Sequence, residues 1–334
     1  MTTQGAYLRK EGETVVVRVE DTTRIQVPLH TLSGVVCFGQ VMMSPQLMAA
    51  CAEKDVFVSF LSEHGRFWAR VQGAVSGNVL LRREQYRRAD DEEQTAAIAR
   101  AVVIAKGANS RTVLLRSARD RPESPGAEAL REGGDTIAKL LDRLRLPQPL
   151  DSVRGIEGSV AREYFARFAH LVAVDDECFR FTGRSRRPPL DPLNALLSFV
   201  YTLLVHDVTG ALEAVGLDPA VGYLHRDRPG RPGLALDLME EFRPHIADRL
   251  VLSLINRRQA QPKGFTTSES GAVTMDDETR KTVLVEYQKR KQEEIRHPFI
   301  DETVAVGLLP HVQALLLARY LRGELDAYPA FVWK

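Results

Sequence analysis

The sequence contains few cysteines and no long apolar run. Only three cysteines occur among its 334 residues: Cys37, Cys51 and Cys178. Their odd number and scattered spacing predict neither a disulfide framework nor a zinc knuckle. No stretch reaches the roughly 18 apolar residues that a membrane span requires, and residues 1–20 lack the apolar centre of a signal peptide. We therefore expect a cytoplasmic protein that has no membrane segment.

Two common catalytic motifs and a strong net charge are also missing. No glycine-rich loop precedes a helix in the way that a P-loop requires, so ATP use is not indicated. The Gly-x-Ser-x-Gly sequence of a nucleophile elbow is absent as well. The net charge is only +1, so nucleic-acid binding would depend on local basic clusters rather than on the total charge.

The distribution of apolar residues predicts two domains of different type. Charged residues make up 27% of the chain and apolar residues 44%, which is typical of a soluble globular protein, and the length allows two separate cores. We predict an α+β protein in which a small N-terminal β-rich, sandwich-like domain precedes a larger all-α catalytic domain. The predicted boundaries are 1–85 for the β-rich domain, 86–96 for a charged linker and 97–334 for the helical domain.

Short segments rich in Val, Ile and Phe characterise the N-terminal domain. The predicted strands are 7–10, 14–19, 23–28, 34–38 and 56–61. One helix interrupts them at 44–54, where Ser44 is a good N-cap and Pro45 occupies the first helical position. Exposed strand edges need a partner, so we expect this domain to form the contact of a homodimer.

Helical spacing of apolar residues continues almost throughout the rest of the chain. The predicted helices are 95–118, 126–144, 158–171, 192–215, 236–256, 276–290 and 297–322. The apolar face of the helix at 192–215 is the expected core of the domain, and His206 on this helix is expected to be a core histidine rather than a ligand. Tyr164 follows Val160 and Ala161 at a spacing that favours core packing over a role as a recombinase-type nucleophile.

One histidine and two carboxylates form the first candidate site. His225 precedes a loop rich in Pro and Gly, and Asp237 and Glu240 then stand three residues apart at the start of a predicted helix. Side chains at i and i+3 share a helix face, so both carboxylates can point at one place. An imidazole together with carboxylates is typical of a divalent-metal site, and the carboxylates favour Mg²⁺ or Mn²⁺. The alternative is an ordinary solvated helix face.

Glu157 is the second candidate, because it stands between Gly155 and Gly158. Small neighbours allow another backbone or a ligand to approach the carboxylate closely. The alternative is an exposed glutamate in the first turn of a helix, where the helix dipole favours a negative charge.

Three motifs that occur in this order carry a resemblance to a known family. They are Arg-Gly-Ile-Glu-Gly-x-x-Ala-Arg-x-Tyr-Phe from residue 154, Gly-Leu-Asp-Pro-Ala-Val-Gly-Tyr-Leu-His from 216, and Leu-Asp-Leu-Met-Glu-Glu-Phe-Arg-Pro from 236. Over most of its length, to about residue 320, the chain resembles the CRISPR-associated integrase and endonuclease of the adaptation module, the Cas1 family.

The resemblance implies which residues form the active centre. Carried over to this sequence, Glu157, His225 and Glu240 would bind one divalent metal ion, Mg²⁺ or Mn²⁺, and Asp237 matches a further acid that some members place near the metal. The implied activity inserts new spacer DNA into a CRISPR array by attack of a DNA 3′-hydroxyl on a phosphodiester. The implied partners are double-stranded DNA (prespacer and CRISPR repeat), a second copy of the chain, the small nuclease Cas2 and a further adaptation nuclease.

Clustered basic side chains are the candidate DNA contacts. The first set lies in a loop that contains Gly183 and Pro188, and the second follows the predicted helix at 236–256. The candidate residues are Arg180, Arg184, Arg186, Arg187, Arg257, Arg258 and Lys263. A charged run is usually a solvated face, but the resemblance favours contacts with the phosphate backbone.

Two other functions fit the same residues. One histidine and two carboxylates also suit catalytic zinc, so a metallohydrolase that acts on a substrate other than DNA is one alternative. A DNA-binding scaffold dimer without catalytic activity is the other. Nothing in the sequence supplies a covalent protein nucleophile, which favours one-step transesterification for the DNA enzyme.

Overall fold

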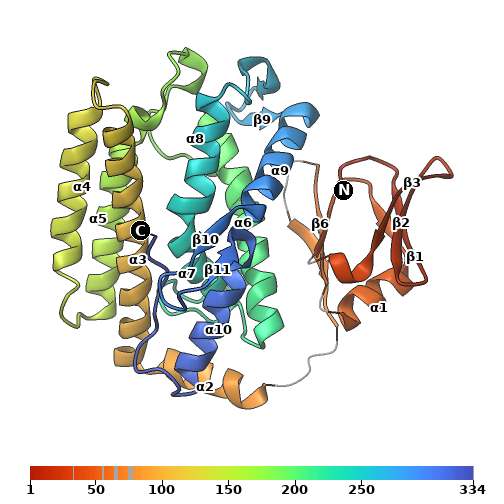
Figure 1. Cartoon of the computed structure of the whole chain (residues 1–334), viewed down its shortest axis with the longest axis horizontal. Coiled ribbons are helices and arrows are strands. Elements are labelled where there is room, and N and C mark those ends of the chain that lie inside the picture. The colour runs from red at the N-terminus through yellow and green to blue at the C-terminus, as the bar shows by residue number, and fades with distance from the viewer. Residues whose placement is uncertain (33, 55, 64–66, 74–77, 334) are drawn as a thin grey trace. The chain divides into compact units, whose positions relative to one another are not determined.

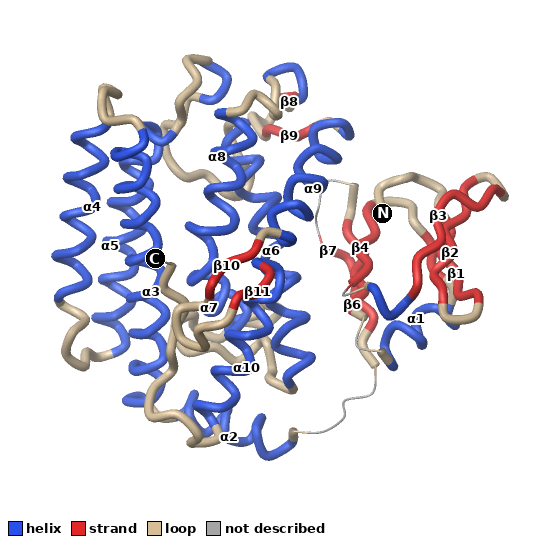
Figure 2. Tube along the Cα trace, viewed as in Figure 1, coloured by secondary structure: helices blue, strands red, loops and turns tan. Residues whose placement is uncertain are grey.

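The chain folds into two compact units, Met1–Gly77 and Asn78–Lys334. The computed structural model describes all residues except 33, 55, 64–66, 74–77 and 334 (Figure 1). Strands predominate in the first unit and helices in the second (Figure 2), which confirms the predicted α+β fold.

The described residues of the N-terminal unit form two small sheets, one α-helix and a short 3-10 turn (Leu29–Thr31) around a shared apolar core. Its strands are β1 (Tyr7–Glu11), β2 (Thr14–Val19), β3 (Thr22–Pro28), β4 (Gly34–Phe38), β5 (Met42–Met43), β6 (Phe57–Leu61) and β7 (Phe67–Val71). One sheet has the order β3-β2-β1-β5 and the other β4-β6-β7. Leu8 and Val17 from the first sheet and Val58 from the second belong to one buried cluster, as expected for a sandwich-like unit.

Helix α1 (Pro45–Glu53) begins where the sequence predicts. The hydroxyl of Ser44 accepts a hydrogen bond from the amide of Leu47 at 3.2 Å, and Pro45 follows at the first helical position. Leu47 and Cys51 on this helix are fully buried in the shared core. Cys51 and the other two cysteines are free thiols, as their spacing predicts.

The second unit consists mainly of helices. They are α2 (Val79–Asp90), α3 (Glu92–Asp120), α4 (Ala127–Asp142), α5 (Leu150–Arg167), α6 (Pro192–Val215), α7 (Gly233–Phe242), α8 (Arg249–Asn256), α9 (Asp277–Gln292) and α10 (Leu309–Leu321), with short 3-10 turns at Phe168–Leu171, Glu177–Phe179, Pro262–Gly264 and Val306–Leu308. Helices α3, α4 and α5 pack side by side (Figure 1). The unit is not purely α-helical, because β8 (Phe265–Thr267) pairs with β9 (Val273–Met275), and β10 (Glu294–Arg296) with β11 (Thr303–Ala305).

The stretch 86–96, predicted as a linker, is helical, and the division between units lies eight residues before the predicted end of the β-rich domain at 85. The charged composition of this stretch suggested a linker, but Arg, Glu and Gln are good helix formers. Glu84 and Arg88 form an i,i+4 ion pair at 2.9 Å on α2. Asp91 then caps α3 by accepting the amide of Gln94 at 3.0 Å.

The predicted helix at 297–322 begins only at Leu309. Residues 294–305 form the β10–β11 hairpin instead, because Pro298 interrupts helical hydrogen bonding and Asp301 turns the chain with a φ of 59°. The predicted helix at 158–171 starts earlier, at Leu150, so Glu157 lies in the middle of α5 rather than in a first turn.

The predicted helix at 236–256 contains a π-helical segment, Arg243–Asp248, between α7 and α8. Pro244 has no amide hydrogen to donate, which removes one bond of the α-helical ladder at this point. Single π-helical turns are common beside functional sites.

Helix α6 matches its predicted bounds. Asp191 caps its start by accepting the amide of Asn194 at 2.7 Å, and Gly216 ends it in the left-handed conformation with a φ of 89°. By length and composition alone α6 could cross a membrane, but 61% of its most apolar window is buried inside the protein. This confirms the expectation that α6 is the core helix of its unit.

Candidate metal centre

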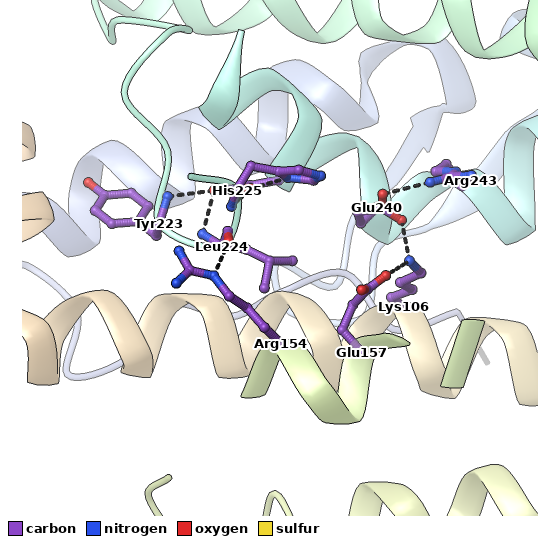
Figure 3. Close-up of polar contacts among 9 residues, drawn as sticks. Lys106, Arg154, Glu157, Tyr223, Leu224, His225, Glu240 and Arg243 are labelled. Atoms are coloured by element: carbon purple, nitrogen blue, oxygen red, sulfur yellow. Dashed lines mark hydrogen bonds and ion pairs between the residues drawn. The ribbon is translucent and has the colours of Figure 1, made fainter. Parts of the chain in front are cut away.

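Two glutamates from different helices contact one ammonium group. Lys106 on α3 donates a hydrogen bond to Oε1 of Glu157 on α5, and its Nζ lies 2.7 Å from Oε2 of Glu240 on α7. Figure 3 shows Lys106 between the two carboxylates. Glu157 and Glu240, which the sequence motifs predict to be ligands of the same metal ion, therefore both contact one positive charge.

The Glu240 carboxylate is buried and strongly held in its ionised form. Only 4% of the residue is exposed, and Nη1 of Arg243 donates to Oε1 at 2.6 Å. Burial alone would raise the pKa of Glu240, but the charges of Arg243 and Lys106 outweigh it and hold the pKa well below its usual range; a charge on His225 acts in the same direction. Glu240 is therefore ready to bind a cation at neutral pH.

Asp237 fixes the position of His225. Its Oδ1 lies 2.6 Å from Nδ1 of His225 and accepts the amide of the same residue at 2.9 Å. Its Oδ2 accepts the amides of Tyr223 at 2.6 Å and Leu224 at 2.9 Å. Asp237 thus satisfies three amides of the preceding loop, rather than those of its own helix, and is only 1% exposed.

The contact with Asp237 also selects the tautomer of His225. Since an ionised carboxylate can only accept, Nδ1 carries the hydrogen and Nε2 is left as the acceptor nitrogen. Carboxylate–imidazole pairs of this kind orient histidine ligands in metal sites. Figure 3 shows the imidazole of His225 directed toward the side on which Glu240 lies.

Two glycines allow the His225 loop to approach α7. A Cβ atom on Gly222 would lie 2.6 Å from the carbonyl carbon of Gly233 and 2.8 Å from Oδ2 of Asp237. A Cβ atom on Gly233 would lie 2.7 Å from the carbonyl oxygen of Ala220. All three distances are too short for a side chain, so the tight approach of these segments requires glycine at both positions.

Arg154 ties α5 to the same loop. Its Nε donates to the carbonyl oxygen of Leu224 at 2.8 Å, and its Nη1 pairs with Asp151 at 3.0 Å. Arg154 precedes Glu157 by three residues, so the helix that carries Glu157 is fastened to the residue before His225.

Sequence reasoning missed Lys106, Arg154 and Arg243 at this centre. Arg154 and Arg243 could have been predicted, because each stands three residues from one of the two glutamates and therefore shares its helix face. Lys106 could not have been predicted, because nothing in the sequence indicates that this one lysine on a long helix is buried. It is 7% exposed.

The donor set fits a small divalent ion, although the described residues contain no group of three or more His, Cys, Asp or Glu side chains already arranged around one point. Glu157 and Glu240 both form ion pairs with Lys106. His225 contacts Asp237. Carboxylate oxygens with an imidazole are ligands that Mg²⁺ and Mn²⁺ accept, and the place where the carboxylates meet already attracts a cation. Glu157, His225 and Glu240 are therefore the residues that would hold the ion.

The glycines beside Glu157 border open space. A Cβ atom on Gly155 or Gly158 would meet no atom within 4 Å among the described residues outside the local helix backbone. No described backbone segment fills this space, so approach of a ligand is the alternative that stays a prediction. A glycine in a helix interior costs about 1 kcal/mol relative to alanine, and packing within the protein does not explain these two.

The structure brings two of the basic segments together. The rings of Phe179 and Phe265 contact edge to face with centroids 5.8 Å apart, and the amide of Val273 donates to the carbonyl of Pro189 at 2.9 Å. The candidate side chains that are exposed on these segments and after α8 are Arg180, Arg186, Arg187, Arg257, Arg258 and Lys263.

Arg184 differs from the other basic candidates. Its guanidinium donates to Oδ1 of Asn194 at 2.6 Å and to Oγ of Ser198 at 3.3 Å, and it lies over the ring of Tyr201. These contacts hold the loop against α6, and the contact of Arg184 with DNA stays a prediction.

Tyr164 is a core residue, as its spacing predicts. It is 3% exposed and packs edge to face against Phe165 and Phe168. Burial raises its pKa well above the usual value, which disfavours the phenolate that a nucleophile would need.

Fold and site together define a two-unit α+β protein whose helical unit carries a partly buried carboxylate–histidine centre suited to a divalent metal. A family model described as CRISPR associated protein Cas1 matches residues 1–289. The chain is 56% identical over its whole length to CRISPR-associated endonuclease Cas1 1 of Chlorobaculum tepidum, covering 97% of that protein. It is 52% identical to CRISPR-associated endonuclease Cas1 2 of Rhodospirillum rubrum, with 100% and 97% coverage. The chain belongs to the CRISPR-associated Cas1 family.

Solved structures share the fold. A Cas1 protein from Thermotoga maritima has a TM-score of 0.80 at 24% identity, with 97% of each chain covered. A casposase bound to its integration product has a TM-score of 0.83 at 22% identity, covering 99% of this chain and 92% of the other. At these identities the likeness concerns the fold.

Proposed function

We propose that this protein is a metal-dependent DNA endonuclease and integrase that inserts spacer DNA into a CRISPR array. Membership of the Cas1 family, whose relatives above are named endonucleases, supports the activity. The observation that carries the metal dependence is the convergence of Glu157 and Glu240 on one cation. The His225–Asp237 pair supplies a third donor of the kind that metal sites use.

The chemistry needs an activated hydroxyl and compensation of charge on the phosphate. A bound Mg²⁺ or Mn²⁺ would lower the pKa of the attacking 3′-hydroxyl and neutralise charge at the phosphodiester. Arg243 keeps Glu240 ionised, and Asp237 holds the imidazole of His225 by its Nδ1 nitrogen. Lys106 adds a positive charge beside the place where the phosphate would react. The open face at Gly155 and Gly158 leaves room for a DNA backbone.

We infer partners from the names of similar proteins. Structural neighbours are a Cas6-RT-Cas1–Cas2 complex and a casposase bound to an integration product, and a relative in Geobacter sulfurreducens is a Cas4–Cas1 fusion. We accordingly expect this chain to act in the cytoplasm on prespacer and repeat DNA, together with Cas2 and an exonuclease of the Cas4 kind.

The direct test is strand joining in a purified system. The protein and Cas2 are incubated with a short duplex that ends in 3′-hydroxyls and a supercoiled plasmid that carries a CRISPR repeat. With Mg²⁺ or Mn²⁺ we expect relaxed plasmid joined to the duplex, and none with a chelator. Glu278→Ala, at an exposed glutamate on α9, is the matched control and should join normally. DNA binding without joining would favour the scaffold, and tightly retained Zn²⁺ without joining would favour the metallohydrolase.

We also propose that the N-terminal unit forms the homodimer contact. Strand β3 is the edge of its sheet, and its residues are largely exposed, including Ile25 at 45%. A chain that begins at Asn78 should sediment as a monomer. If that chain does not fold, Ile25→Lys in the full-length protein should weaken the dimer. A dimer that survives both changes would refute this assignment.

A further inference from the structure

The end of the chain is buried although it forms no helix or strand. Among residues 328–333, here called the C-terminal strap, Tyr328 is 6% exposed, Phe331 0% and Trp333 7%. An irregular segment with buried backbone must find hydrogen-bond partners outside itself. The strap finds them on α3, on α7 and on α10.

The strap forms hydrogen bonds with Glu241, the residue that follows the candidate metal ligand Glu240. Glu241 is fully buried, and its Oε1 accepts the hydroxyl of Tyr328 at 2.7 Å. Its Oε2 accepts the amide of Phe331 at 2.7 Å and Nε2 of Gln313 at 3.0 Å. Consecutive residues of an α-helix point roughly 100° apart, so Glu240 faces the metal centre while Glu241 faces the strap.

Asn109 links the strap to the same helix that carries Lys106. Its Nδ2 donates to the carbonyl oxygens of Glu241 at 2.7 Å and Phe331 at 2.9 Å, and its Oδ1 accepts the amide of Trp333 at 2.7 Å. Lys106 and Asn109 stand at i and i+3 on α3. One face of α3 therefore contacts both Glu240, through Lys106, and the strap.

His297 fixes the orientation of the Gln313 side-chain amide. The fully buried His297 accepts the amides of Phe299 and Ile300 at Nδ1, at 3.2 and 3.3 Å, so its Nε2 donates to Oε1 of Gln313 at 2.9 Å. The Gln313 nitrogen is then turned toward Glu241. Every group in this network has its complement, and such satisfied buried networks specify one arrangement.

The far end of the strap is held by stacking. The indole of Trp333 lies 3.9 Å from the Arg116 guanidinium, 4.5 Å from that of Arg249 and 4.4 Å from the ring of His245. His245 belongs to the π-helical segment that follows α7. The strap thus contacts both Glu241, through hydrogen bonds, and His245, through ring stacking.

We propose that the C-terminal strap is a positioning element of the metal centre, which fixes the rotation of α7 so that Glu240 faces Glu157. The inference rests on the proposed function. Without the strap, the buried carboxyl group of Glu241 would lose two of its three hydrogen-bond partners, which is costly enough to favour rotation of α7 toward solvent. Such a rotation would carry Glu240 away from Lys106 and Glu157.

The test compares Mn²⁺ binding with overall stability in the full-length protein. Tyr328→Phe removes one hydroxyl from Glu241, and deletion of residues 328–334 removes the strap. Leu196→Ala is the control, because Leu196 is a fully buried residue of α6, and its replacement lowers stability while the hydrogen-bond partners of the strap on α3, α7 and α10 are kept. Mn²⁺ affinity is measured by calorimetry and the Mn²⁺ environment by electron paramagnetic resonance, beside the melting temperature.

We expect Tyr328→Phe to weaken Mn²⁺ binding by about 10-fold and to alter the Mn²⁺ spectrum, while Leu196→Ala melts at least as early and binds Mn²⁺ as the wild type does. Should the deletion variant fail to fold, Tyr328→Phe decides alone. Unchanged Mn²⁺ binding in Tyr328→Phe, or an equal loss in Leu196→Ala, overturns the role of the strap and leaves the proposed function intact. A wild-type protein that binds no Mn²⁺ overturns both.

Discussion

The two units of this protein differ most in what they bury. Among the described residues, the buried polar side chains of the N-terminal unit are Ser44 and Ser59, both uncharged. The helical unit buries a set of ionisable side chains: Lys106, Asp237, Glu240, Glu241, Arg243 and Asp248. Burying a charge is costly, so the second unit carries a cost that the first does not, and the proposed metal chemistry would account for this cost.

The comparison also shows how the cost is offset. Each buried charge at the centre has a specific partner, as Glu240 has in Lys106 and Arg243. Replacing an apolar residue in the N-terminal unit removes contacts, but removing one partner in the helical unit leaves a charge uncompensated. The predictions below probe this difference, from the largest expected effect to the smallest.

Glu240→Ala should abolish both Mn²⁺ binding and strand joining. The variant removes the carboxylate that is ionised and buried at the centre, and no neighbouring acid is placed to replace it, since Asp237 is occupied by His225 and three amides. Calorimetric titration with Mn²⁺ and the plasmid-joining reaction measure the two losses. Retained binding with a wild-type affinity would show that Glu240 is not a ligand.

Asp237→Asn should reduce activity by about 10–100-fold, the usual range for residues that orient a metal ligand. The amide group cannot accept from all the donors that Asp237 satisfies, so His225 loses its fixed tautomer and the loop loosens. Metal titration separates this variant from Glu240→Ala. If Asp237→Asn loses the metal and Glu240→Ala keeps it, the ligand assignment is reversed.

Lys106→Met should tighten Mn²⁺ binding, by about 10-fold if the competing ion pair contributes about 1.4 kcal/mol. In the metal-free protein the variant should be less stable, because Glu157 and Glu240 lose their shared ammonium. Added Mn²⁺ should therefore raise its melting temperature by more than it raises that of the wild type. Thermal melts with and without Mn²⁺ measure both effects.

The control for Lys106→Met is Leu8→Ala in the N-terminal unit. Leu8 is 2% exposed in the apolar core, so its loss should cost about 2–5 kcal/mol of stability. We expect no change in Mn²⁺ affinity. A loss of affinity in Leu8→Ala would contradict the division of labour between the units, and weaker binding in Lys106→Met would contradict competition between Lys106 and the metal.

The smallest effect on the metal centre is expected at Asp248, which contributes to the pH dependence of stability. Burial raises the pKa of Asp248 from about 3.8 to about 6, although Arg243 acts in the opposite direction. Because the folded state binds the proton more tightly than the unfolded state, this contribution to stability is fully present below about pH 4 and is lost as pH rises through 6. A shift of two units corresponds to about 3 kcal/mol.

Asp248→Asn should remove this part of the pH dependence. Urea unfolding at several values between pH 4 and 7 gives the free energy of unfolding of both proteins, and the wild type should lose more stability than the variant across the window. Parallel curves would mean that Asp248 titrates at an ordinary pH in the folded protein.

The sequence alone determined the features that depend on neighbours along the chain. The start of α1 at Ser44 and Pro45, and both ends of α6 at Asp191 and Gly216, follow from capping preferences that act within a few residues. The fold class was also predictable, because the spacing of apolar residues differs between strands and helices. The candidate residues Glu157, His225 and Glu240 could be identified because each lies in a short contiguous motif.

Only the tertiary structure decided how the centre is assembled. Lys106 meets Glu157 and Glu240 because α3, α5 and α7 pack together, and Phe331 of the strap, 90 residues further along the chain, reaches Glu241. Local sequence signals cannot report such contacts, since burial and charge pairing arise when distant segments pack. The helical stretch at 86–96 and the hairpin at 294–305 were mispredicted for a related reason, because composition and periodicity leave short segments ambiguous until their packing is known.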